Sequence, residues 1–150
     1  MQHATSLRDA FIGRWQLVSS TFRQADGTII YPLGQQAEGR ISYDQHGQMS
    51  AQLMRPQRER LSSRDATEER LAKVKAAFDG YTAYYGSYTI DAENQSVTHH
   101  VAGSLLPNWV GRQLVRYFEF SHDNTRLALT TPPMGKKAGI VGTLVWEKMG

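Results

Sequence analysis

The chain has 150 residues, of which 40% are hydrophobic and 21% are charged, and this balance predicts one folded domain over residues 1–150 rather than a disordered chain. The sequence contains no cysteine, which excludes disulfides, thiolate nucleophiles, cysteine-ligated zinc and iron–sulfur clusters. The net charge of +3, without aromatic residues interleaved among the basic ones, argues against nucleic-acid binding. There is no signal-peptide pattern and no apolar run of the roughly 20 residues that cross a bilayer, so we expect a cytoplasmic protein without membrane contact.

Alternating hydrophobicity and frequent turn residues predict that most of the chain forms short strands. Each expected strand is bounded by Gly, Pro, Asn or Asp, and together they cover residues 13–22, 28–31, 39–44, 48–54, 81–90, 96–101, 112–120, 126–131 and 140–148. A flat sheet of this size would leave two unprotected edges, and closure removes both of them. The sequence therefore predicts an all-β fold, an antiparallel up-and-down β-barrel of about eight to ten strands.

Helical patterns occur at two places. One turn over residues 6–11, which Thr5 or Ser6 can cap, leads into the first strand. A longer helix is expected between residues 65 and 80, where Leu71, Val74 and Phe78 fall at helical spacing. Its apolar side is expected to lie on the barrel, so that this inserted helix acts as a lid or plug.

Several segments of the chain resemble the bacterial and fungal lipocalin-like domain family, a group of calycin-type β-barrels. A Gly-x-Trp pattern at residues 13–15 opens the first strand, as in lipocalins. Further similar stretches follow in order at residues 31–34, 49–56, 97–101, 107–111 and 129–133. The chain lacks the second Thr-Asp-x-x-Tyr-type motif, the signal peptide and the disulfides of classical secreted lipocalins, so it resembles the cytosolic branch. The resemblance implies a barrel with a ligand cavity and says little about the ligand.

Arg116 is the strongest candidate for a ligand-binding side chain. In the strand over residues 112–120, alternation places Leu114, Arg116, Phe118 and Phe120 on one face, which puts a guanidinium among aromatic rings. A buried guanidinium needs an acceptor. The acceptor is either the acidic oxygen of a ligand or a group of the protein itself, such as an acid or backbone carbonyls, and stacking on Trp15 at the closed end is a further possibility.

His99 is the second candidate. It shares a face with Val97 and Val101, whereas His100 points to the other side, so the two histidines cannot ligate one metal ion. No metal site and no cofactor are expected. His99 suits a general base near neutral pH, and the competing interpretation is an inward histidine that is satisfied by a tyrosine hydroxyl.

Tyrosines near residue 86 predict a cavity wall. Tyr84 and Tyr88 lie on one face with Gly86 between them, which is expected to leave open space, although such rings also fill barrel cores. In the strand over residues 48–54 either face can point inward, and Gln52 is a candidate ligand donor if its face is the inner one.

Trp109 and Met134 lie at expected strand ends, where side chains surround the mouth of a barrel. Trp109 is either a cover for a hydrophobic ligand or a loop anchor.

These residues predict a barrel that binds a small hydrophobic molecule, aromatic or polyketide-like, with an acidic oxygen. The expected ligand-binding residues are Arg116, Tyr84, Tyr88, His99, Gln52, Phe118, Phe120 and Trp109. The alternative is a cofactor-free isomerase, cyclase or hydratase in which His99 or Tyr84 moves a proton and Arg116 stabilises negative charge. The expected partner is the small molecule, with no nucleic acid or membrane, and a homodimer is possible.

Overall fold

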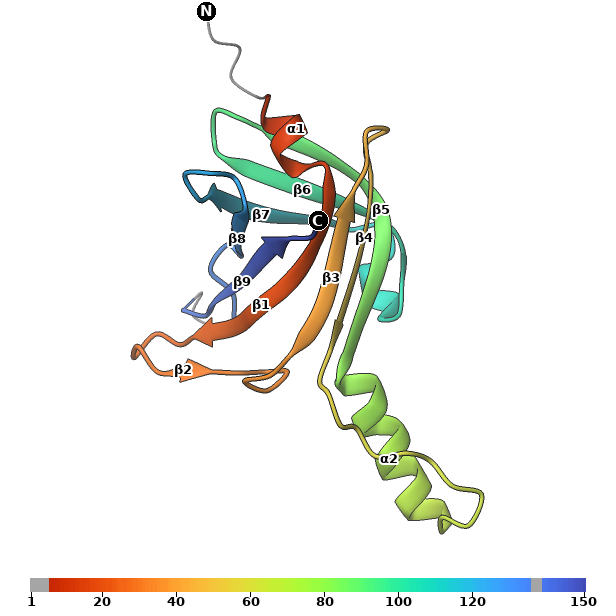
Figure 1. The fold of residues 1–150 in the computed structure, drawn as a ribbon. Coiled ribbons are helices and arrows are strands. Elements are labelled where there is room, and N and C mark those ends of the chain that lie inside the picture. Colours follow the sequence, from red (N-terminus) through yellow and green to blue (C-terminus); the bar gives the residue numbers. More distant parts are fainter. Residues whose placement is uncertain (1–5, 136–138) are drawn as a thin grey trace, which may run out of the picture.

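The computed structural model describes residues 6–135 and 139–150, which form a closed antiparallel β-barrel of eight strands with a ninth short strand beside it (Figure 1). The strands are β1 (Gly13–Arg23), β2 (Ile29–Ile30), β3 (Glu38–Tyr43), β4 (Gln48–Met54), β5 (Tyr81–Asp91), β6 (Ser96–Ser104), β7 (Gln113–Phe120), β8 (Arg126–Thr130) and β9 (Val141–Lys148). The helices are α1 (Leu7–Phe11), α2 (Thr67–Asp79) and a 3₁₀ turn, η1 (Pro107–Trp109). The predicted all-β barrel with one short N-terminal helix and one inserted helix is confirmed.

The barrel closes through β1, which pairs with β3 along one edge and with β9 along the other. The first part of β1 pairs with β3, so that Trp15 lies opposite Ile41, and most of its length pairs with β9. The short β2 extends the sheet only at the far end of β1, where Phe22 lies opposite Ile30. All other neighbours follow chain order, each antiparallel to the one before. Closure thus leaves no long unpaired edge among the barrel strands that the structure describes.

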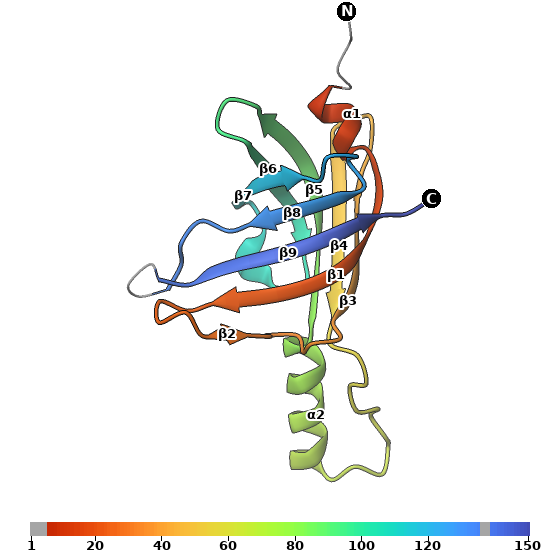
Figure 2. The same ribbon diagram turned by 60° about the vertical axis from the view of Figure 1, so that its left-hand side comes forward.

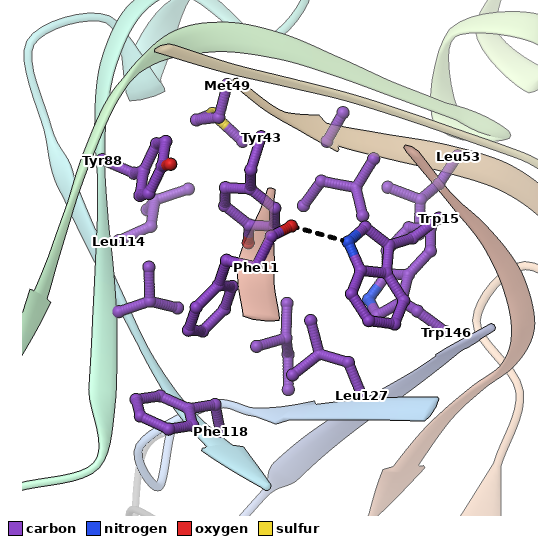
Figure 3. Close-up of a cluster of buried hydrophobic side chains, with 14 of the residues drawn as sticks. Phe11, Trp15, Tyr43, Met49, Leu53, Tyr88, Leu114, Phe118, Leu127 and Trp146 are labelled. Atoms are coloured by element: carbon purple, nitrogen blue, oxygen red, sulfur yellow. Dashed lines mark hydrogen bonds between the residues drawn. The ribbon is translucent and has the colours of Figure 1, made fainter. Parts of the chain in front are cut away.

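The short helix α1 closes one end of the barrel. The Ser6 hydroxyl accepts a hydrogen bond from the Asp9 backbone N–H at 3.1 Å, which caps the helix as predicted. Phe11, at the end of α1, is fully buried, and its carbonyl accepts a hydrogen bond from Trp15 Nε1 at 2.9 Å (Figure 3). This bond fixes the entry of the chain into β1.

Aromatic rings fill the half of the barrel next to α1. Phe11 makes edge-to-face contacts with Tyr43, Phe118 and Phe120, with ring centroids 5.1, 5.1 and 4.9 Å away. These rings come from α1, β3 and β7, so they tie the helix to both sides of the barrel (Figure 3). This half of the interior is packed solid by side chains.

The inserted helix α2 does not cover the barrel, so the predicted lid or plug is wrong. None of its residues is buried, and Leu71, Val74 and Phe78 are 64%, 45% and 41% exposed. Figures 1 and 2 show α2 extending away from the end opposite α1. The backbone N–H of Arg55, just after β4, donates to the carbonyl of Gly80, just before β5, at 2.7 Å. This bond holds together the two ends of the inserted segment, which therefore extends the β4–β5 hairpin.

None of the helices in the described part of the chain combines the length and the apolar character of a membrane-spanning helix.

Candidate functional site

A cavity of about 290 Å³ lies inside the barrel at the end away from α1. Its apolar walls are made by Phe22, Leu33, Leu53, Trp109, Met134 and Leu144. Its polar residues are Ser20, Asp79, Thr82, Tyr84, Arg116, Thr131 and Thr143, and the Asp79 carboxylate is paired with Lys75. The cavity joins the last residues of β1 and β4 to the first residues of β5 and β9, so it opens at the end from which α2 and η1 project. A hollow with mostly apolar walls and a few convergent polar groups is typical of a small-molecule site.

Arg116 is a partly buried cation in this cavity. Alternation along β7 directs Leu114, Arg116 and Phe118 into the barrel, as predicted, and Arg116 lies opposite Val97 of β6. Its Nη1 donates to the Val115 carbonyl at 2.9 Å, and no ion pair joins it to a carboxylate within residues 6–135 and 139–150. The Arg116 guanidinium does not stack on Trp15. The cation over that ring is Lys148, whose Nζ lies 4.9 Å from the ring centroid. The guanidinium therefore retains donors for an acceptor from outside the protein.

His99 connects two tyrosines inside the barrel, of which Tyr84 lines the cavity. Its Nε2 lies 2.6 Å from the Tyr43 hydroxyl and its Nδ1 lies 2.8 Å from the Tyr84 hydroxyl. The three side chains come from β6, β3 and β5, and His99 is 1% exposed. The interpretation of His99 as an inward histidine satisfied by tyrosine thus agrees with the geometry.

Burial keeps this group of side chains uncharged. It lowers the pKa of His99 from 6.5 to about 3, with a further contribution from the nearby Arg116 cation. It also raises the pKa of Tyr84 to about 12, opposed by Arg116, and raises that of Tyr43 well above 10. Both ring nitrogens of His99 are engaged, so the arrangement favours ordering of the tyrosine hydroxyls over proton abstraction by His99.

The neutral His99 gives a prediction for the pH dependence of stability. In the unfolded chain the imidazole takes up a proton near pH 6.5, whereas in the folded protein it stays neutral down to about pH 3. The free energy of unfolding should therefore fall as the pH drops below 6.5, with a slope that rises from about 0.7 kcal/mol per pH unit at pH 6.5 toward about 1.4 near pH 5. Urea unfolding at pH 6.5, 5.75 and 5.0 measures this slope. The variant His99→Gln should lose the contribution of His99 to this pH dependence. An equal slope in wild type and variant would contradict a His99 that stays neutral in the folded protein.

Trp109 stands between the cavity and the exterior. Its ring meets that of Tyr84 edge-on, with centroids 5.5 Å apart and planes at 82°. The 3₁₀ turn η1 holds it beside the start of β5, and Met134 lines the same cavity. Both residues therefore lie at the barrel mouth, where the sequence places them.

Five predicted ligand-binding residues do not line the cavity: Tyr88, His99, Gln52, Phe118 and Phe120. His99 is hydrogen-bonded to the cavity residue Tyr84 without lining the cavity itself. Phe118 and Phe120 belong to the packed half against Phe11. Tyr88 lies in the same half, and its hydroxyl donates to the Asp44 carbonyl at 2.7 Å. Gln52 is exposed, because β4 turns Met49, Ala51 and Leu53 inward and the alternate residues outward. The lining of this cavity does not include these five residues, and their contact with a ligand stays a prediction.

Gly86 does not create open space. A Cβ atom at this position would lie 1.8 Å from the His100 carbonyl oxygen, at the place where the register between β5 and β6 shifts. The glycine therefore permits close approach of two strands at a β-bulge, and the prediction of space beside it is wrong.

The sequence interpretation missed Ser20 and Phe22 as cavity residues. Trp15 and Leu17 are buried, so strict alternation would turn Ser19 inward instead. The register between β1 and β9 shifts between Leu17 and Ser19, and after this irregularity Ser20 is the buried residue. A bulge inside a strand leaves no distinctive mark in this stretch of sequence.

An open groove also lies on the outside of the barrel. A larger hollow of about 430 Å³ lies on the outer face of β1, β3 and β4, where Gln16, Glu38, Arg40 and Gln52 line it, so it is an open polar groove. Within the described ranges no three His, Asp or Glu side chains are close enough to hold a metal ion.

Comparison with known proteins supports the interpretation of the fold. The family model described as "Lipocalin-like domain" matches residues 12–149. A 4'-hydroxy-3'-methoxypropiophenone carrier protein of Aspergillus oryzae is 33% identical over 110 residues, which cover 67% of this chain and 96% of that protein. The barrel and the carrier relative both support binding of a small molecule.

Proposed function

Because the chain belongs to the lipocalin-like domain family, we propose that it binds a small aromatic molecule with an acidic oxygen in the cavity beside Arg116. One observation carries the proposal. Arg116 is a cation inside a cavity with mostly apolar walls, and no carboxylate pairs with it in the described residues, since Asp79 at the edge of this cavity pairs with Lys75. Placing a charge in such a site is unfavourable unless a partner compensates it, and a phenolate, enolate or carboxylate of a ligand supplies that partner.

The cavity volume favours a small ligand. At about 290 Å³ it lies at the lower limit of ligand sites, which span roughly 300–1,000 Å³. Such a volume suits one aromatic ring with short substituents rather than a multi-ring polyketide. The edge-on pair of Tyr84 and Trp109 offers such a ring aromatic surfaces at the mouth.

The name of the Aspergillus relative suggests a chemical class for the ligand. The compound in that name is a phenol with a methoxy group and a propanoyl chain, 4'-hydroxy-3'-methoxypropiophenone. A carbonyl para to a phenol delocalises the negative charge of the phenolate and makes the hydroxyl more acidic. We therefore propose para-acyl phenols as the ligand class of this chain, with the ionised oxygen on Arg116.

A binding experiment tests this function. The probe is 4'-hydroxy-3'-methoxypropiophenone, and the control compound is its 4'-O-methyl ether, which keeps the ring and the chain but cannot ionise. Titration calorimetry near pH 8 should show saturable binding of the phenol, and the ether should bind at least tenfold more weakly. Equal affinity for both compounds, or no binding of the phenol, would contradict the proposal.

The binding geometry does not favour the acid–base alternative. Both nitrogens of His99 are bonded to tyrosine hydroxyls, and Tyr84 remains protonated because burial raises its pKa to about 12. We therefore propose binding without turnover. The phenol should be recovered chemically unchanged after prolonged incubation with the protein, as mass spectrometry can verify.

A further inference from the structure

The hydrogen-bonded chain Tyr43–His99–Tyr84 has one more proton than it can use internally. Each hydroxyl carries a proton, and a neutral imidazole carries one on either Nδ1 or Nε2. The structure contains two contacts between these groups, Tyr43 to Nε2 and Tyr84 to Nδ1. Two protons fill these two contacts, so the third must be donated to an acceptor outside the chain.

The two ends of the chain differ in what surrounds them. Tyr43 is 1% exposed, and its ring contacts those of Phe11 and Tyr88, with centroids 5.1 and 4.8 Å away. Its hydroxyl has His99 as its hydrogen-bond partner, and no second acceptor for it occurs in the part of the chain that the structure describes. Tyr84, in contrast, lines the cavity together with Arg116. Only the Tyr84 end can reach an acceptor that is not part of the protein.

This difference selects one direction for the protons. If Tyr84 donated to Nδ1, the Nε2–H would donate to Tyr43, and the Tyr43 hydroxyl proton would be left buried without an acceptor. In the opposite direction Tyr43 donates to Nε2, Nδ1–H donates to the Tyr84 oxygen, and the Tyr84 proton is free for the cavity. In this second arrangement all three donors, the two hydroxyls and the imidazole N–H, have a partner once the cavity holds an acceptor.

We propose that Tyr43 and His99 hold the Tyr84 hydroxyl as a hydrogen-bond donor toward the cavity, so that the ligand must present an acceptor oxygen there. This inference rests on the proposed function and deepens it. Arg116 selects a negatively charged oxygen. Tyr84 selects a group that accepts a hydrogen bond, such as a carbonyl, ether or ionised oxygen, over a group that can only donate, such as an ammonium. Tyr43 does not line the cavity, so it is a positioning residue that acts through His99.

The tautomer of His99 tests the proposal directly, without any ligand. Long-range ¹H–¹⁵N NMR correlations distinguish an imidazole protonated on Nδ1 from one protonated on Nε2, and the His99→Gln variant assigns the His99 signals. The wild-type protein should show the Nδ1–H form. The Nε2–H form would overturn the proposal, whether or not the phenol probe binds, so its failure is distinguishable from that of the proposed function.

Variants test the direction of the chain. Tyr43→Phe removes the donor to Nε2, and a population of the Nε2–H tautomer should then become visible. Tyr88→Phe is the matched control, since Tyr88 also packs on Tyr43 but its hydroxyl donates to the Asp44 carbonyl. This variant should keep the wild-type tautomer. A spectrum in Tyr43→Phe identical to that of wild type would count against the positioning role.

Affinity for the phenol probe gives the second readout. Tyr84→Phe keeps the ring against Trp109 but removes the donor, and it should weaken binding by about three- to tenfold, the usual contribution of a neutral hydrogen bond. Tyr88→Phe should bind as wild type does. Unchanged affinity in Tyr84→Phe would show that the ligand accepts no hydrogen bond from this hydroxyl and would overturn the proposal.

Discussion

Replacing Arg116 with glutamine should weaken the binding of 4'-hydroxy-3'-methoxypropiophenone by about tenfold to a hundredfold. A hydrogen bond to a charged group is worth about 1.5–3 kcal/mol, and each 1.4 kcal/mol corresponds to a factor of ten in affinity. Glutamine keeps a side-chain N–H but removes the positive charge and the forked geometry of the guanidinium. Titration calorimetry of wild type and variant at a pH where the phenol is ionised measures the loss.

Two comparisons separate charge recognition from a general disturbance of the cavity. Arg116→Lys keeps the charge without the fork, so its affinity should lie between those of wild type and Arg116→Gln. The 4'-O-methyl ether cannot ionise, and its weak binding should change little in either variant. The barrel should remain folded, because Arg116 makes one hydrogen bond to a neighbouring carbonyl and no ion pair within the described residues. Equal losses for phenol and ether would contradict the role of Arg116.

Phe11→Ala should lower the free energy of unfolding by about 3–5 kcal/mol, the usual cost of truncating a fully buried phenylalanine. Phe11 is 0% exposed and contacts three rings of the packed half, Tyr43, Phe118 and Phe120. The truncation leaves a void among them and loosens the helix that closes this end. Urea unfolding at neutral pH measures the difference.

The matched control for Phe11 is Leu71→Ala on the exposed helix α2. Leu71 is 64% exposed, so this truncation should change stability by less than about 0.5 kcal/mol. Ligand affinity should be retained in folded Phe11→Ala protein, because the cavity lies at the opposite end of the barrel. If Phe11→Ala lowered the free energy of unfolding by less than about 1 kcal/mol, the packing of α1 on this end of the barrel would not contribute to stability as proposed.

The faces of several strands could be predicted from the sequence because side chains alternate across a sheet. This rule placed Arg116 and His99 inside the barrel, and both are there. Alternating segments bounded by turn residues predicted the strands and, through closure of the edges, the barrel class. These features depend on local spacing, which a single sequence contains.

The depth of a side chain inside the barrel could not be predicted in the same way. Arg116 and Phe118 share one face of β7, yet Arg116 lines the cavity and Phe118 packs on Phe11 in the filled half. Alternation gives the side of a strand, whereas depth depends on strand tilt and on which end α1 occupies. Alternation alone therefore predicts more residues in the cavity wall than the cavity has.

Contacts between strands that are far apart in the sequence could not be predicted either. Tyr43 and His99 are 56 positions apart, and their hydrogen bond depends on the order and register of β3 to β6. The helix α2 escaped for a different reason, since its apolar spacing indicated a buried side although Leu71, Val74 and Phe78 remain exposed. Periodicity shows that a helix has an apolar face and does not show what that face contacts.

A crystal structure of the protein with bound 4'-hydroxy-3'-methoxypropiophenone tests the central claim most directly. We expect the ring in the cavity beside Trp109, with its phenolate oxygen within hydrogen-bonding distance of the Arg116 guanidinium. A phenol seated in the outer groove near Gln52 and Arg40, or one inside the barrel with its oxygen turned away from Arg116, would contradict the account.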